Sequence, residues 1–264
     1  MNRISTTYLI LLFALANAHA QEHGDKKQIS DDPAPTAPSE QALSASANLQ
    51  EVLSKLDLPG IKVNLEEWSV DIDASISLQA GLLELIACTK DTKEHESIVV
   101  VEARPSHIHT ALLLLGAKPG KPASNQIVGG EGPDTRFIEI PPRGQRMDVY
   151  LIPNPKQGIA YPIHEFIMPA AHHDARVAES NRPKETPKPK FIFAGSRLHG
   201  GEDIPKFYVA DRSGSVVSLA TFGDELICLD GVHDSSNDSL IWEANPEKLP
   251  QIGNKVILRL KPAR

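Results

Sequence analysis

Residues 98–120 have the sequence IVVVEARPSHIHTALLLLGAKPG, and this stretch decides the class of fold. Its first four residues, Ile98–Val101, are apolar and mostly β-branched, which is typical of a strand buried on both faces. Pro105 suits the first turn of a helix, and Gly116 followed by Pro119 marks the end of one. The stretch therefore predicts a strand followed by a helix in the middle of the chain.

The pattern on either side of this stretch is mainly that of strands. Leu49, Val52, Leu53 and Leu56 have helical spacing that ends at Pro59-Gly60, and Trp68, Val70 and Ile72 then alternate as in a half-buried strand. Further strands are predicted at 136–140, 147–152, 191–194, 207–210, 216–222, 240–243 and 256–260. We therefore predict an α+β fold that is mostly β, with a mixed or antiparallel sheet and one or two short helices packed on it.

The N-terminal region predicts export. Arg3 precedes an apolar run that ends in Ala18-His19-Ala20, and this arrangement is typical of a cleavable signal peptide over residues 1–20. Residues 21–47 are rich in Pro, Ser and Ala, which predicts a disordered tether. The folded domain is expected at 48–262, with a polar, Pro-rich loop at about 169–190, and the protein is expected in the periplasm or outside the cell.

Charge and hydropathy exclude some partners. The full chain carries a formal net charge of −7, whereas proteins that bind nucleic acid need clustered cations. No second apolar run approaches the roughly 20 residues of a membrane span. We therefore expect no nucleic-acid partner and no transmembrane segment in the mature chain.

The chain has two cysteines, Cys88 and Cys228. Two cysteines can pair in an oxidising compartment, but a buried cysteine is more often a small apolar side chain. Two cysteines are too few to hold the fold together, so a hydrophobic core must stabilise it. The sequence leaves open whether the two cysteines pair.

The densest group of reactive or metal-binding side chains lies at 84–96 and at the start of the predicted helix. Its members combine a thiol, imidazoles and carboxylates: Glu84, Cys88, His95, Glu96 and His109. Such groups bind transition metals, zinc or iron among them, or build a Cys–His nucleophilic pair. Cys88, His95, Glu96 and His109 are the candidate metal ligands, and all five residues are candidates for a binding site.

Helical geometry limits this set. His107 and His109 lie two positions apart on the predicted helix, about 200° around its axis, so they cannot share one metal ion. His109 lies on the side of Leu112 and Gly116, which is the side expected to be buried. His109 is therefore kept as a candidate and His107 is not.

Five stretches together resemble one known family: GLLELIACTKDTKEHESIVVV (81–101), HTALLLLGAKPG (109–120), FIFAGS (191–196), YVADRSGSVVSLATFGDELICL (208–229) and SSNDSLIWEANPEKLPQIGNKVILRLKP (235–262). This pattern resembles the YdjY-domain family of exported bacterial proteins, which are common in planctomycetes and have no assigned activity. The resemblance covers about residues 60–262.

The resemblance implies which positions belong to the family pattern. All five candidate residues match motif positions, as do Gly116, Gly120, the segment 193–196, Asp211 and Asn237, whereas His107 does not. Cys228 stands where the family has another residue, which disfavours a disulfide with Cys88. The family name implies iron–sulfur chemistry in a relative, but this chain lacks the four cysteines that such a cluster needs.

Three functions remain open. The first is a ligand- or metal-binding module of the cell envelope built on the Cys/His/Glu cluster. The second is a structural or protein-interaction domain of the envelope, whose partner is another envelope protein. The third is an enzyme in which Cys88 is the nucleophile, His109 or His95 the base, and Glu96 the orienting acid.

Overall fold

The structure is a computed structural model that describes residues 55–130, 132–170, 188–201, 204–237 and 239–263. All of these residues fall within one compact unit. The predicted signal peptide and tether, most of the helix predicted before Pro59 and most of the loop predicted at 169–190 lie outside the described residues. Within the described part, no helix is long and apolar enough to cross a membrane.

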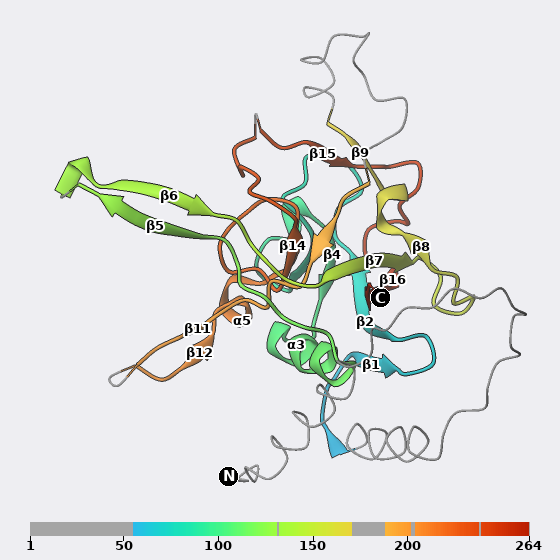
Figure 1. Ribbon diagram of the computed structural model, residues 1–264. Coiled ribbons are helices and arrows are strands. Elements are labelled where there is room, and N and C mark those ends of the chain that lie inside the picture. Colours follow the sequence, from blue (N-terminus) through green and yellow to red (C-terminus); the bar gives the residue numbers. More distant parts are fainter. Residues whose placement is uncertain (1–54, 131, 171–187, 202–203, 238, 264) are drawn as a thin grey trace, which may run out of the picture. The chain divides into compact units, whose positions relative to one another are not determined.

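A closed barrel of mixed strands forms the centre of the fold (Figure 1). Among the described residues, ten strands form one sheet, in which β1 (Ile61–Asn64) pairs with β2 and β8 (Tyr161–Pro162) pairs with β7 outside the ring. The other eight close on themselves because β4 pairs with β2. In order around the barrel they are β2 (Ser69–Ile76), β16 (Lys255–Pro262), β7 (Arg146–Ile152), β10 (Phe191–Ile192), β14 (Ile227–Leu229), β13 (Ser215–Ser218), β3 (Leu85–Thr89) and β4 (Ser97–Val101).

Alternation along the strands explains why the sheet has an inside and an outside. In β2, Val70 and Ile72 are fully buried in the core, whereas Asp71 points to the outer face. Strand β16 places Leu258 opposite Ile72 and Arg259 opposite Asp71. The outer pair forms two hydrogen bonds of 2.6 and 2.8 Å between guanidinium and carboxylate, so both faces of this pairing favour the same register.

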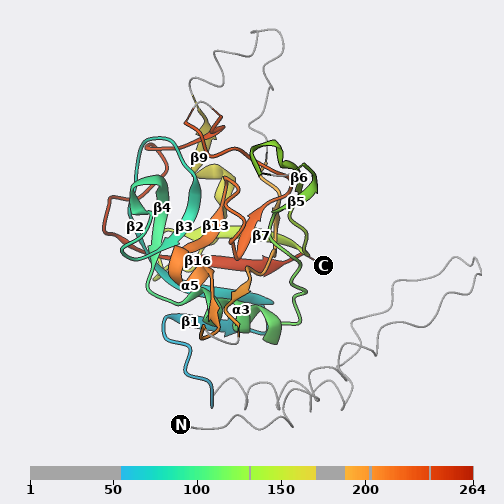
Figure 2. The ribbon, with the colours of Figure 1, turned by 90° about the vertical axis from the view of Figure 1, so that its left-hand side faces the viewer.

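Helix α3 (Pro105–Leu114) packs beside β1 and β2, as the second view also shows (Figure 2). Its Ile108 is fully buried in the hydrophobic core. Its first turn is held by Asp211 of helix α5 (Ala210–Ser213), whose carboxylate accepts hydrogen bonds of 2.8 Å from both the backbone N–H and the hydroxyl of Ser106. A carboxylate at a helix N-terminus satisfies free N–H groups and complements the helix dipole.

Smaller elements complete the unit. In the part of the chain that the structure describes, three two-stranded sheets pair β5 (Ser124–Gly129) with β6 (Arg136–Ile140), β9 (Ile167–Pro169) with β15 (Trp242–Ala244), and β11 (Leu198–His199) with β12 (Phe207–Tyr208). Short 3₁₀ turns lie at η1 (Glu94–Glu96), η2 (Gly132–Asp134) and η3 (Ile163–Glu165). The β5–β6 hairpin projects away from the barrel (Figure 1).

The predicted fold class is confirmed, since the unit is mostly β, its main sheet is mixed and its helices are short. The strand and helix predicted within 98–120 are β4 and α3. The strand predicted at 207–210 is wrong in its second half. Strand β12 ends at Tyr208, and Ala210 begins α5, a short helical turn that ends at Gly214 (φ 79°).

Candidate functional site

The five residues predicted to form one site lie in three places. Glu84 and Glu96 are neighbours, and the Glu84 N–H donates a 3.2 Å hydrogen bond to the Glu96 carbonyl. Burial, followed by the charge of Glu96, raises the pKa of the Glu84 carboxyl. His95 lies beside them, with Nε2 3.7 Å from a Glu96 carboxylate oxygen and its side chain 78% exposed. These three residues form a polar surface patch.

Cys88 lies beneath the turn that precedes this patch and is fully buried. Burial raises the pKa of its thiol, and hydrogen-bonding groups of Ser97, Lys93 and Thr92 oppose that shift only partly. A nucleophilic cysteine needs access to its substrate and a lowered pKa. Cys88 has neither property in this structure.

Cys88 and Cys228 are both free and buried. Strand β13 lies between them, because Ser215 is opposite Cys88 and Ser218 is opposite Cys228. Two strand spacings separate their Cα atoms by roughly 9–10 Å or more, and a disulfide requires less than about 7 Å. The pairing that the sequence left open is therefore not formed.

His109 lies apart from the other four candidates, on α3. Its Nδ1 is 2.7 Å from the hydroxyl of Tyr208, which donates a 2.9 Å hydrogen bond to the Gly195 carbonyl. Because the single hydroxyl proton is used in that bond, His109 Nδ1 carries the proton that Tyr208 accepts. Burial lowers the pKa of His109, so the ring is neutral near pH 7.

No group of three or more His, Cys, Asp or Glu residues that could hold a metal ion occurs among the described residues. The proposed ligand set of Cys88, His95, Glu96 and His109 is accordingly not gathered at one point. The sequence placed these residues together because three of them are close along the chain, but the strand and the turn that carry them direct them to different surroundings.

His109 instead supports a sharp corner of the chain at Gly195 and Ser196. Gly195 and Ser196 adopt positive φ values of 84° and 50°. A Cβ atom on Gly195 would lie 2.8 Å from the Cβ of Pro119 and 3.3 Å from Cε1 of His109. The Ser196 N–H donates to the Glu225 carbonyl at 2.8 Å. The corner is therefore fixed from both sides.

A second close approach lies beside this corner. The N–H of Gly120 donates to the Phe193 carbonyl at 2.9 Å, and a Cβ atom on Gly120 would lie only 1.7 Å from the Arg143 carbonyl oxygen. Only glycine fits at this position without movement of the backbone. Three turns, which follow Pro119, Pro141 and Phe193 in the chain, therefore meet at one place.

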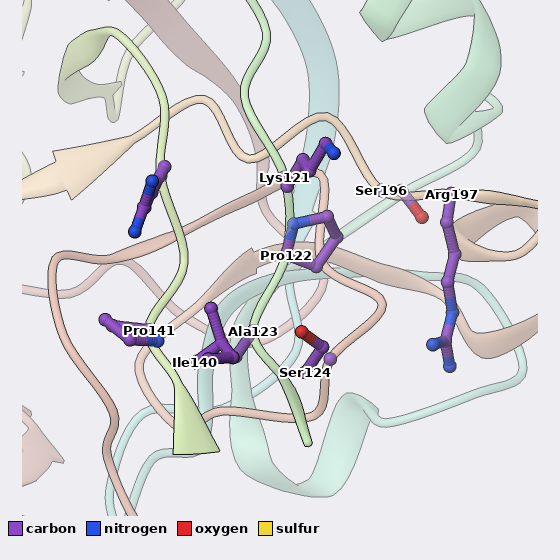
Figure 3. A pocket seen from close by; sticks show the side chains of 10 residues that line it. Lys121, Pro122, Ala123, Ser124, Ile140, Pro141, Ser196 and Arg197 are labelled. Carbon is purple, nitrogen blue, oxygen red and sulfur yellow. The ribbon is translucent and has the colours of Figure 1, made fainter. Parts of the chain in front are cut away.

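A cleft of about 580 Å³ opens where these turns meet the base of the β5–β6 hairpin (Figure 3). Its walls combine three cationic side chains with small and apolar residues: Lys121, Pro122, Ala123, Ser124, Ile140, Pro141, Arg143, Ser196, Arg197 and Gly223. No carboxylate lines it among the described residues. Sequence reasoning missed the cations because they lie in three turns far apart along the chain; the glycines and prolines around them were the available signal.

The fold and the cleft define a class of protein: a closed mixed β-barrel domain with a cationic cleft at the meeting point of its turns. The chain belongs to the YdjY domain family, whose match covers residues 61–261. No curated protein and no solved structure matches the chain.

Proposed function

We propose that this domain is a ligand-binding module of the bacterial cell envelope and that its binding site is the cleft lined by Lys121, Arg143 and Arg197. The observation that carries the proposal is the cleft itself, which at about 580 Å³ lies within the usual range for small-molecule sites. The location in the envelope rests on the signal peptide predicted at residues 1–20.

The turns beside the cleft support the proposal. They are held by close contacts at Gly120 and Gly195, which precede the lining residues Lys121 and Ser196, and by the hydroxyl of Ser196, which donates a 2.5 Å hydrogen bond to the Asp224 carbonyl. Turns fixed in this way need little ordering on binding, and such preorganisation favours affinity. Gly120, Gly195 and Ser196 are also among the positions that carry the resemblance to the family.

A ligand site at the Cys/His/Glu cluster has less support. Cys88 is buried with a raised thiol pKa, and His109 is engaged by Tyr208. A metal at this cluster would require these residues to converge, and elemental analysis of the full chain tests this directly. Stoichiometric zinc or iron that is lost in Cys88→Ser would restore the cluster as the site.

Protein interaction is a second candidate function, and one observation favours it. The β5–β6 hairpin exposes four large apolar side chains, which are between 45% and 63% accessible: Ile127, Val128, Phe137 and Ile138. Ile127 lies opposite Phe137 in the pairing of the two strands, and exposed apolar surface of this kind is typical of interaction sites.

The test of the proposed function uses two adjacent residues of β5. Successive strand residues point to opposite faces, and Ser124 lines the cleft whereas Asn125 does not. The full chain and the variants Ser124→Trp and Asn125→Trp are mixed with a small-molecule extract of the producing cells, and the amide NMR signals of Ser196 and Gly223 are followed. We expect shifts for wild type and Asn125→Trp and none for Ser124→Trp. Equal shifts in both variants, or none in wild type, would count against the cleft.

A further inference from the structure

We infer that the cleft binds a small organic anion, whose phosphate or carboxylate group is attracted by the positive charges of Lys121, Arg143 and Arg197 and whose apolar part lies on the wall formed by Pro122, Ile140 and Pro141. This inference rests on the proposed function and names the chemical class of its ligand.

Lys121 and Arg143 are held directly opposite each other. The N–H of Lys121 donates to the Arg143 carbonyl at 2.9 Å, and the N–H of Arg143 donates to the Lys121 carbonyl at 2.8 Å. Residues that exchange both hydrogen bonds in an antiparallel pair project their side chains from the same face. Like charges at such a position are destabilising, and an anion bound between them would relieve the repulsion.

Arg197 brings the third positive charge from a different segment. It follows the corner at Ser196, whose backbone is fixed by hydrogen bonds to Asp224 and Glu225. In the close view its side chain extends on one side of the segment that carries Pro122, with Pro141 on the other side (Figure 3). The three cations therefore come from three turns of one cleft.

None of these three side chains forms an ion pair with a described carboxylate. Elsewhere in the described structure, Arg104, Arg146 and Arg259 each lie within 4 Å of a carboxylate oxygen. The full chain also carries a net charge of −7, so a carboxylate partner for each cation was available in composition. The three exposed cations of the cleft are therefore available to an anion from solution, and Arg binds carboxylate and phosphate with two parallel hydrogen bonds.

The remaining wall of the cleft favours an organic ligand over an inorganic ion. Pro122, Ala123, Ile140 and Pro141 line it beside the cations. Apolar walls with a few placed polar groups are typical of sites for organic ligands. An acid that carries a compact apolar body matches both parts of the lining.

The test compares ligands of matched shape and different charge. The full chain is titrated with phenylacetate, phenyl phosphate and the neutral phenylacetamide, and binding is followed by the amide NMR signals of Ser196 and Gly223. We expect both anions to bind more tightly than phenylacetamide and to weaken at high salt. Arg143→Gln and Arg197→Gln should each weaken anion binding about tenfold, whereas Arg136→Gln, an exposed change of the same charge outside the cleft, should leave it unchanged.

Two results would overturn the inference. One is binding of phenylacetamide as tight as that of phenylacetate, and the other is anion binding that is absent or indifferent to both arginine variants. Fractionation of the cell extract on an anion exchanger separates this failure from that of the proposed function. A neutral fraction that shifts the cleft signals keeps the proposed function and removes the anion; an extract with no active fraction removes both.

Discussion

His109 and Tyr208 form a 2.7 Å hydrogen bond, although they are 99 residues apart in the chain. The hydroxyl of Tyr208 in turn donates a hydrogen bond to the Gly195 carbonyl. The ring of His109 also packs edge-on against Phe193, with the ring centroids 4.9 Å apart. The helix is thereby tied to the corner that forms one side of the cleft.

The first prediction concerns this connection. Tyr208→Phe removes the hydroxyl and leaves the His109 N–H and the Gly195 carbonyl without their partner, so we expect the free energy of unfolding to fall by about 1–3 kcal/mol. Urea unfolding measures this change. Tyr161→Phe is the control, since Tyr161 is 38% exposed and should change stability by less than about 0.5 kcal/mol. Equal losses in both variants would contradict the role given to Tyr208.

A second prediction uses the close approach at Gly120. Gly120→Ala places a methyl group against the Arg143 carbonyl, so the backbone must move, and we expect a loss of about 3 kcal/mol in stability together with altered NMR signals around the cleft. Gly201→Ala is the matched control because nothing lies within 4 Å of its Cβ position. A Gly120→Ala protein as stable as Gly201→Ala would show that the turns are not fixed as described.

The third prediction is a pH dependence that arises from Glu225. This residue is fully buried, and one of its carboxylate oxygens has no hydrogen-bond partner while the other accepts the N–H groups of Phe222 and Gly223. Burial raises its pKa above the ordinary value of 4.5. The folded state therefore binds this proton more tightly than the unfolded state, and stability falls as the pH rises above 4.5.

Denaturation of wild type and Glu225→Gln across this pH range measures the effect. The variant has no proton to lose at this position, so the difference between the two proteins should grow in favour of the variant as the pH rises. The exposed Glu139→Gln removes the same charge and should keep the wild-type slope. Parallel curves for wild type and Glu225→Gln would refute the prediction.

The fourth prediction concerns the two thiols. Cys88 and Cys228 are buried, and burial raises the pKa of both. We expect neither to react quickly with a disulfide reagent at neutral pH in the folded protein, and both to react after unfolding. If one thiol of the folded protein reacts rapidly and this reaction is lost in Cys88→Ser, the result would support the hypothesis of a cysteine-dependent enzyme.

The sequence predicted those elements whose pattern is local. Strand β4 and helix α3 follow from a β-branched run and from the proline and glycine at the ends of the helix. Strand β3 was missed because its apolar residues are mostly not β-branched, so the run cannot be told from a buried helix by its pattern. Strand β5 was missed because it is polar in its first half and exposed along its length.

The candidate site was harder to predict for a physical reason. Proximity in sequence grouped Cys88 with His95, yet the strand buries the first and the turn exposes the second. The cleft depends on pairings that bring Lys121, Arg143 and Arg197 together from separate turns. Such pairings join segments that are separated along the chain, and a local pattern carries no information about them.

Closure of the barrel also has a consequence for how the chain folds. Strand β16 lies between β2 and β7, and the ion pair of Asp71 with Arg259 joins residues 188 positions apart. Pairings of such long range form slowly because the intervening chain must first be ordered. A growing chain that has not yet supplied β16 leaves β2 and β7 with open edges, which are templates for pairing with other chains. Until β16 pairs with both strands, closure of the barrel within one molecule therefore competes with association between molecules.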